Sequence, residues 1–223
     1  MTSVADKNQS RGRPRSEKAR QAILVAAMEL LLDQGLHPMS MDDVARRAGV
    51  SKATIYRWWP SKERLALDAL ATEWASSASA RRRDTETLRG DLLALFRPWV
   101  RQLNERPYAR VVAGLVAAAA NDAEFAELYR QNFVQPRRDA SRVLLVRARD
   151  RGEIAADTDL EVALDLLYGP IYHRLLHGHA PLTERFAQQV IDAVIAAMSP
   201  QQPPTTRAAS SSPQLVPRYP EER

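Results

Sequence analysis

Apolar and polar positions alternate along this chain with a helical period. In the segment 16–34, Ile23, Ala27, Leu30 and Leu31 recur at three- and four-residue spacings and form one apolar stripe. The segment 61–83 has a similar apolar side, and Gly35 ends the first of these two helices. We found no strict apolar–polar alternation of the kind that predicts a half-buried strand. The fold class expected is therefore all-α.

The second half of the chain continues this helical pattern. Further helices are expected at 85–105, 107–120, 124–151, 160–178 and 183–198. Pro98, Pro136 and Pro170 fall inside these segments and predict kinks or breaks. Residues 199–223 carry six of the fourteen prolines together with Ser, Thr and Gln, which predicts a disordered tail.

Between the first two long helices, residues 40–62 read SMDDVARRAGVSKATIYRWWPSK. Ser40 and Ser51 are good N-caps, and Gly49 can supply a left-handed C-cap between two short helices. Ile55 and Trp59 are four residues apart, so they share a buried face and turn Ala53 and Arg57 outward. A short second helix with small and basic residues outward meets the requirements of a helix that reads DNA.

This order of residues resembles the helix-turn-helix of the TetR family of bacterial transcriptional repressors, over roughly residues 16–70. The resemblance implies an N-terminal three-helix DNA-binding domain, joined by a long helix to a helical ligand-binding and dimerisation domain. The expected divisions are a disordered basic arm at 1–15, the DNA-binding domain at 16–62, the C-terminal domain at 63–198 and the tail at 199–223. The resemblance also implies a homodimer formed through the last two helices. Such a dimer binds a palindromic operator in double-stranded DNA, with its two reading helices ~34–36 Å apart.

The resemblance also assigns DNA-binding positions. Lys52, Ala53, Thr54 and Arg57 match positions that face the major groove, and Arg57 is the expected base contact because a guanidinium can donate twice to guanine. Family positions that bind phosphates are matched by Ser40, Tyr56, Trp58 and Lys62. Trp58 departs from the family, in which histidine is commoner there, so either an indole N–H contact to phosphate or simple packing is open.

Charge is concentrated near this motif. Residues 1–64 contain 12 Lys and Arg against 7 Asp and Glu, whereas the rest of the chain has 20 of each. Arg11, Arg13 and Arg15, with Gly12 and Pro14 between them, are similar to the core of an AT-hook, which lies in the minor groove of A·T-rich DNA. A flexible basic arm that touches phosphates is the other interpretation, and the sequence leaves both open.

Large side chains of the C-terminal domain are candidates for an effector pocket, although any one of them can be ordinary core. The resemblance implies that several line one pocket for an unidentified small molecule. The candidates are Trp74, Phe96, Trp99, Tyr108, Phe125, Tyr129, Tyr168 and Tyr172. For the dimer interface, the candidates are Leu164, Leu167, Ile171, Leu175, Phe186, Val190, Val194 and Ile195.

Several classes of function are not expected. The chain has no cysteine, so disulfides, thiolate nucleophiles and Cys-based zinc sites are excluded. His173 and His177 have the spacing of two metal ligands and His179 follows, but no Cys or nearby carboxylate completes the set, so no metal is expected. Without a nucleophile motif we expect neither an enzyme nor a cofactor. The longest apolar run, 111–120, is short of the ~20 residues that span a bilayer, and no signal-peptide pattern opens the chain. A cytoplasmic protein without a membrane partner is expected.

Two functional hypotheses result. The first is a ligand-responsive transcriptional regulator, a repressor released from its operator when a small molecule binds the C-terminal domain. The alternative is a ligand-independent architectural DNA-binding protein that uses the basic arm and has a filled core.

Overall fold

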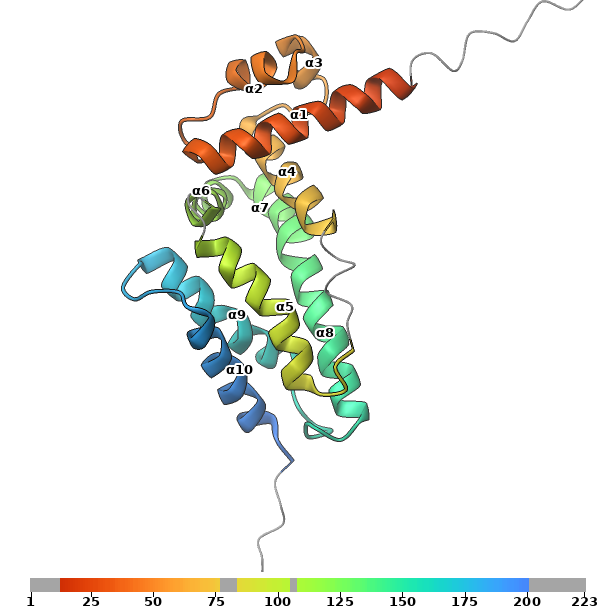
Figure 1. Ribbon diagram of the computed structural model, residues 1–223, viewed down its shortest axis with the longest axis vertical. Coiled ribbons are helices and arrows are strands. Elements are labelled where there is room, and N and C mark those ends of the chain that lie inside the picture. Colours follow the sequence, from red (N-terminus) through yellow and green to blue (C-terminus); the bar gives the residue numbers. More distant parts are fainter. Residues whose placement is uncertain (1–12, 77–83, 105–107, 201–223) are drawn as a thin grey trace, which may run out of the picture.

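The computed structural model describes residues 13–76, 84–104 and 108–200, and within these residues the only regular structure is helical. The molecule has an upper part, in which α1 runs beneath α2 and α3, and a lower part made of the remaining helices (Figure 1). The helix α4 passes from one part to the other. The all-α prediction, with an N-terminal helix-turn-helix and a helical C-terminal domain, is confirmed.

The upper part consists of α1 (Arg13–Gln34), α2 (Met41–Ala48), α3 (Lys52–Tyr56) and the first turns of α4 (Lys62–Ser76). Its core is built from fully buried side chains of each helix, among them Ile23, Val44, Ile55 and Leu65. The first helix begins at Arg13, three residues before the expected start at Ser16. The last residues of the expected basic arm, 13–15, are therefore helical in their backbone, since the fixed φ of proline suits the first turn of a helix.

The turn between α2 and α3 has the capping geometry that the sequence predicts. The Ser40 hydroxyl accepts a hydrogen bond from the Asp43 backbone N–H at 3.1 Å and donates one to the Asp43 carboxylate at 2.6 Å. Gly49 has φ 67°, a left-handed conformation that costs other residues free energy. Ser51 Oγ accepts from the Thr54 backbone N–H at 3.2 Å. Local sequence therefore fixes the angle at which α3 leaves α2.

The lower part contains α5 (Leu88–Asn104), α6 (Tyr108–Asn121), α7 (Ala123–Tyr129), α8 (Gln135–Asp150), α9 (Leu160–His177) and α10 (Glu184–Met198). The helices α5, α8, α9 and α10 run along the long axis of the molecule, and α6 lies nearly end-on beneath α1 (Figure 1). Apolar residues from all six helices form a core that is continuous with that of the upper part.

Two of the three prolines leave their helices unbroken. Pro98 lies inside α5 and Pro170 inside α9. The predicted single helix at 124–151 is instead interrupted, because a π-helical turn, η2 (Arg130–Val134), joins α7 to α8 just before Pro136. A proline lacks an N–H, and its ring clashes with the carbonyl four residues earlier, that of Asn132; a wider turn relieves this clash.

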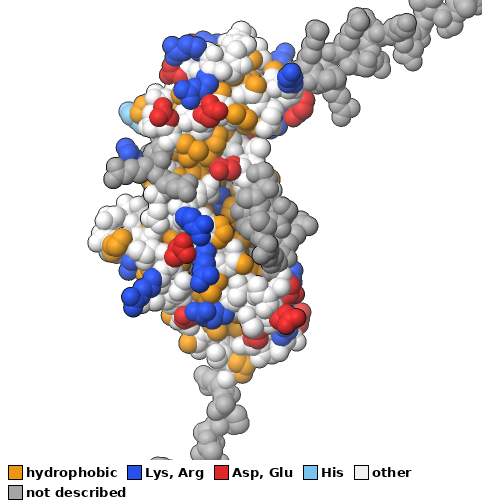
Figure 2. Space-filling model, in the orientation of Figure 1, with side chains coloured by type: hydrophobic (Ala, Val, Ile, Leu, Met, Phe, Trp, Pro, Cys, Tyr) orange, Lys and Arg blue, Asp and Glu red, His pale blue; other side chains and the backbone are white. Residues whose placement is uncertain are grey.

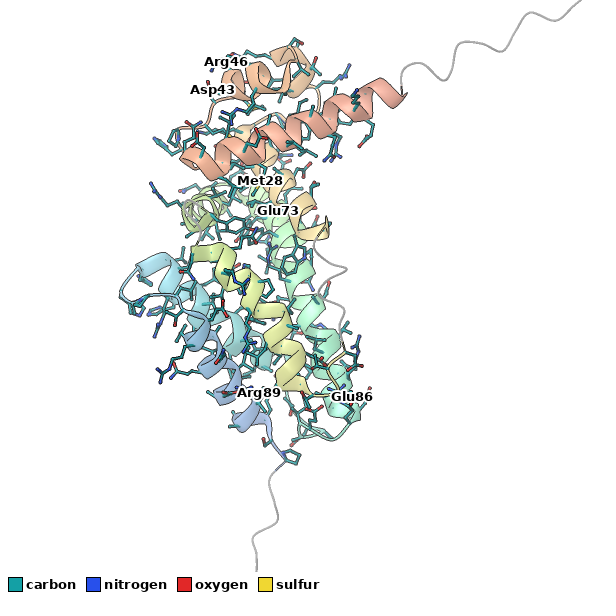
Figure 3. The ribbon with its side chains drawn as sticks, in the orientation of Figure 1. Met28, Asp43, Arg46, Glu73, Glu86 and Arg89 are labelled. Carbon is teal, nitrogen blue, oxygen red and sulfur yellow. The ribbon has the colours of Figure 1, made fainter. Side chains whose placement is uncertain are left out.

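The junction between the two parts contains a cavity of about 610 Å³. It is lined by the connection between α1 and α2, by the start of α4 and by small side chains of α6, including Ala113, Gly114 and Ala117. Figure 2 shows hydrophobic side chains at the waist between the upper and lower parts. Figure 3 shows Glu73 of α4 at the level where the lower helices begin.

Candidate functional site

The short helix α3 presents a polar outer face. Lys52, Ala53 and Arg57 are exposed and Thr54 is half-buried, whereas Ile55 is 0 % exposed on the opposite face. The predicted division between a buried face and an outward face is therefore present. Contact of these four outward residues with DNA stays a prediction.

Lys52 is already paired with a neighbouring helix. Its Nζ lies 2.9 Å from a carboxylate oxygen of Asp42 on α2, and the hydrogen bond to Asp42 raises the pKa of the lysine. On the same helix, Arg46 pairs with Asp43, and both lie at the tip of the upper part (Figure 3). Exposed ion pairs of this kind are weak in water, so both cations can exchange a carboxylate for a phosphate.

Two of the predicted phosphate contacts have intramolecular roles. The Ser40 hydroxyl caps α2, as described above. The Lys62 ammonium donates hydrogen bonds to the His37 carbonyl at 2.8 Å and the Met39 carbonyl at 3.3 Å. Lys62 therefore ties the first turn of α4 to the connection between α1 and α2. An ammonium has three donors, which leaves one for a phosphate.

The adjacent tryptophans have opposite environments. Trp59 is 3 % exposed and donates its indole N–H to Asp68 Oδ2 at 2.9 Å, as expected for a core residue. Trp58 is 40 % exposed. The guanidinium carbons of Arg20 and Arg57 each lie 6.0 Å from the Trp58 ring centroid. The Trp58 ring is therefore exposed and close to two cations, and it is not a core residue.

Tyr56 is also exposed, at 48 %, and can offer its hydroxyl to a phosphate. The basic arm is not placed: Arg11 lies outside the described residues, as do the side chains of Arg13 and Arg15. Their contacts with the minor groove or with phosphates stay predictions.

In the lower part, four of the predicted pocket residues touch one another. Ring centroids are 5.7 Å apart for Phe96 and Trp99, 5.1 Å for Phe96 and Tyr168, and 5.9 Å for Trp99 and Tyr172. The Tyr168 hydroxyl donates to the backbone carbonyl of Arg137 at 2.7 Å. The sequence therefore selected residues that do form one aromatic cluster between α5, α8 and α9.

Arg137 lies at one side of this cluster and is 2 % exposed. Its guanidinium carbon is 4.2 Å from the centroid of Trp74 and 3.6 Å from that of Phe133, so both rings contact the cation. Tyr129 stacks on Phe133 with centroids 5.1 Å apart. Nη1 of the guanidinium donates to the Phe133 carbonyl at 2.7 Å.

The tyrosines around Arg137 stay neutral. Burial raises the pKa of Tyr108 and that of Tyr168 to about 12. Burial likewise raises the pKa of Tyr129 and of Tyr172, against the opposing effect of the Arg137 charge. These four hydroxyls are hydrogen-bonding groups at neutral pH and not counter-ions. Phe125 is buried on α7, and within the described residues no ring contact joins it to the cluster.

The sequence-based selection missed Arg137. A signal for it exists, because Phe133, Arg137, Ser141 and Leu144 follow the spacing of one buried helix face, and all four are buried. The selection also missed the cavity at the junction of the two parts.

Five of the eight residues expected at a dimer interface are buried within the chain itself: Leu164, Leu167, Ile171, Val190 and Val194. Their assignment to contacts with a second copy is therefore corrected. They form the contact between α9, α10 and the rest of the lower part, because a helix packs its widest apolar face on its own domain first. The large apolar side chains that α9 leaves exposed are Val162, Leu166 and Leu176.

The histidines cluster without forming a metal site. The His173 ring lies 4.7 Å from that of His177 and 4.8 Å from that of His179, and all three are exposed. Within the described residues, no group of three His, Asp or Glu side chains is arranged to hold a metal ion.

The structure combines a capped helix-turn-helix, whose second helix has a basic outer face, with a helical domain that encloses an aromatic cluster. This combination is typical of a DNA-binding regulator. Residues 23–69 match the family model described as "Bacterial regulatory proteins, tetR family", and residues 82–194 match "Tetracyclin repressor-like, C-terminal domain". The chain belongs to the TetR family of bacterial transcriptional regulators.

Individual relatives support this membership over most of the chain. The HTH-type transcriptional regulator YdeS of Bacillus subtilis is 40% identical over 183 residues, which cover 81% of this chain and 90% of YdeS. The DNA-binding transcriptional repressor TetR of Mycobacteroides abscessus is 32% identical over 184 residues, covering 81% of this chain and 94% of that protein. The crystal structure of the TetR family transcription regulator SCO0332 superimposes with a TM-score of 0.71 at 37% identity, covering 82% of this chain and all of that one.

These relatives are transcriptional regulators and not enzymes. In the part of the chain that the structure describes, no helix is long and apolar enough to cross a membrane.

Proposed function

We propose that this protein is a ligand-responsive transcriptional repressor, released from its operator when a small molecule binds the aromatic cluster of the lower part. The observation that carries this proposal is the placement of α4. At its first residue, Lys62 holds the connection between α1 and α2, and at its other end Trp74 lies against Arg137. One helix thus contacts both the DNA-binding part and the candidate effector site.

A ligand that changes the position of Trp74 acts on the reading helix through α4. Glu73, next to Trp74, accepts a hydrogen bond from Gln102 Nε2 of α5 at 2.8 Å, so this end of α4 is also fixed to the lower part. The ligand needs only a higher affinity for the arrangement of α4 that does not fit the operator, since differential affinity shifts the population of two states.

The operator is palindromic and the protein binds it as a homodimer through α9 and α10. Val162 and Leu166 are exposed four residues apart on α9, on a face that a second copy can cover. Binding to a chromosomal operator takes place in the cytoplasm. Repression, rather than activation, is supported by the name of the 32% identical relative from Mycobacteroides abscessus, a transcriptional repressor.

A titration of DNA from the promoter upstream of the protein's own gene tests the reading helix. Arg57→Ala should lose about 1–3 kcal/mol of binding free energy and discriminate less at one base pair. Tyr56→Phe should weaken binding to all sequences alike. The matched control is Arg149→Ala, which removes an arginine from α8 in the lower part. Unchanged affinity and selectivity of Arg57→Ala would contradict the assignment of α3.

The architectural alternative gives a different result in the same assay. Such a protein would bind the promoter fragment and unrelated DNA with similar affinity, and no small molecule would release it.

A further inference from the structure

The guanidinium of Arg137 is buried and only partly hydrogen-bonded. The side chain is 2 % exposed, and two of its three nitrogens, Nε and Nη2, have no hydrogen-bond partner. The third, Nη1, binds only a neutral backbone carbonyl, that of Phe133. Among the described residues, no ion pair within 4.0 Å joins a carboxylate to Arg137, whereas Arg20, Arg138 and Arg151 each have one.

A cation in this position is unfavourable for folding unless something compensates it. The two flanking rings offset part of the cost, since a cation over an aromatic face gains about 0.5–2 kcal/mol. An unpaired buried charge still costs several kcal/mol in a protein interior. The nearby tyrosines cannot supply a negative charge, because burial raises their pKa values. An anion bound at Nε and Nη2 would satisfy both donors and compensate the charge.

We propose that Arg137 is the anchor for the acidic group of the effector, and that the effector is an aromatic carboxylate. This proposal rests on the effector site proposed above. A carboxylate has two acceptor oxygens, which match the two free donor nitrogens of a guanidinium in a bidentate pair. The neutral hydroxyls of Tyr108 and Tyr172 are donors for a carboxylate oxygen or a further polar group.

The rings around Arg137 favour a flat body for this ligand. Trp74 and Phe133, which is itself stacked on Tyr129, present two aromatic surfaces to the guanidinium. Trp74 and Tyr172 are half-buried, while Tyr108, Tyr129 and Phe133 are buried. In this proposal the planar ligand approaches the guanidinium from the side of Trp74, a residue of α4, and of Tyr172, because these two are the half-buried members of the set.

The test uses the full-length protein and matched pairs of acids and amides. Benzoate, trans-cinnamate and 2-naphthoate are compared with benzamide, cinnamamide and 2-naphthamide by thermal shift and by release of a labelled promoter fragment. At least one acid should raise the Tm and release DNA, and its amide should bind at least about 30-fold more weakly, because the pair with Arg137 is lost. Arg137→Gln should lose this preference for the acid. The control, Arg130→Gln, removes an exposed arginine of the same segment that pairs with Glu127 and should keep it.

The ligand-free protein gives a second, independent measurement. Arg137→Met replaces an uncompensated buried charge by an apolar side chain of similar length, so its Tm should be equal to or higher than that of the parent, with DNA binding retained. A Tm lowered by more than a few degrees would show that Arg137 has a structural counter-ion and would overturn the proposal.

The outcomes separate the two proposals. If an amide binds as tightly as its acid and Arg137→Gln makes no difference, the anion anchor is wrong and the effector site stands. If none of the six compounds binds, the aromatic-carboxylate proposal is rejected, while the promoter titration with Arg57→Ala still decides whether the protein is a sequence-specific regulator.

Discussion

A terminal methyl carbon of Leu36, in the connection between α1 and α2, lies 3.1 Å from the position that a Cβ would occupy on Gly114 of α6. This approach is tighter than ordinary van der Waals contact, and it joins the upper part directly to the lower part. The cavity at the junction lies beside it. The contact therefore gives α6 a route to the reading helices that is separate from α4.

Substitutions at Gly114 test this contact. Gly114→Ala should change the free energy of unfolding by less than about 0.5 kcal/mol, since the flexible end of Leu36 can move into the cavity. Gly114→Phe cannot be accommodated in this way and should displace the connection before α2, lowering the affinity for the promoter fragment about tenfold or more, a change of about 1.4 kcal/mol. Fluorescence anisotropy with labelled DNA measures the affinity. Parental affinity in Gly114→Phe would mean that α6 does not influence the position of α3.

The two adjacent tryptophans should respond differently to the same change. Trp59→Phe removes the indole N–H from Asp68 in a buried site and should cost about 1–3 kcal/mol of unfolding free energy. Trp58→Phe alters an exposed ring and should cost less than about 0.5 kcal/mol. Urea unfolding followed by circular dichroism measures both. Equal destabilisation by the two variants would contradict the assignment of Trp58 to the surface.

The first turn of α9 should contribute a pH-dependent stability. Hydrogen bonds from Arg142 and Arg138 lower the pKa of Glu161 to about 2. Because the folded-state pKa is below the unfolded value, the stabilisation is present at pH above about 4–5 and is lost as the pH falls toward about 2. The Tm of the parent should therefore exceed that of Glu161→Gln at neutral pH, and the difference should vanish in acid.

Salt provides the control for Glu161, whose side chain is 55 % exposed. A difference that arises from its ion pairs should also shrink in about 1 M NaCl, where the Debye length is about 3 Å. A Tm difference that is constant with both pH and salt would point to a packing effect of the substitution.

Gly90, near the start of α5, should tolerate no side chain. An added Cβ would lie 2.2 Å from Thr85 Oγ1, and that hydroxyl donates at 2.8 Å to the buried Asp91. Gly90→Ala must therefore move Thr85 and should lose about 1–3 kcal/mol of unfolding free energy. In the double variant with Thr85→Ala, the loss should be smaller than the sum of the two single losses. The reason is that Thr85→Ala removes the hydroxyl with which the new Cβ would clash. Strict additivity in chemical denaturation would contradict the clash.

The helix-turn-helix could be predicted from the sequence because its determinants are local. Ser40, Gly49 and Ser51 cap helices through groups three or four residues away, and the four-residue spacing of Ile55 and Trp59 sets the buried face. The helix boundaries of the lower part follow from the same rules to within a few residues. The bond from Lys62 to the His37 carbonyl spans 25 residues, and no local pattern predicts it.

Two features could not be predicted for a different reason: the burial of Arg137, and the burial within the chain of residues expected at the dimer interface. Arginine side chains are usually exposed, so the residue type predicts a surface position for Arg137. The helical spacing, which places it on the buried face of α8, gives the correct result. For α9, the large residues Leu164, Leu167 and Ile171 were assigned to a partner, although a helix uses such residues for its own core before any surface is left for a second chain.

The π-helical turn at Arg130–Val134 sets, by helical phase alone, which side chains of α8 face the aromatic cluster. Tyr129 precedes this turn, and Arg137 and Ser141 follow it. Deleting one residue from the turn would restore regular α-helical bonding, and would rotate everything after it by about 100° and shift it by about 1.5 Å relative to Tyr129. Arg137 would lose its contacts with Trp74 and Phe133, although no residue of the site had been substituted. Insertion or deletion at this turn is thus a route by which a protein of this architecture can exchange the polarity of its ligand in a single step.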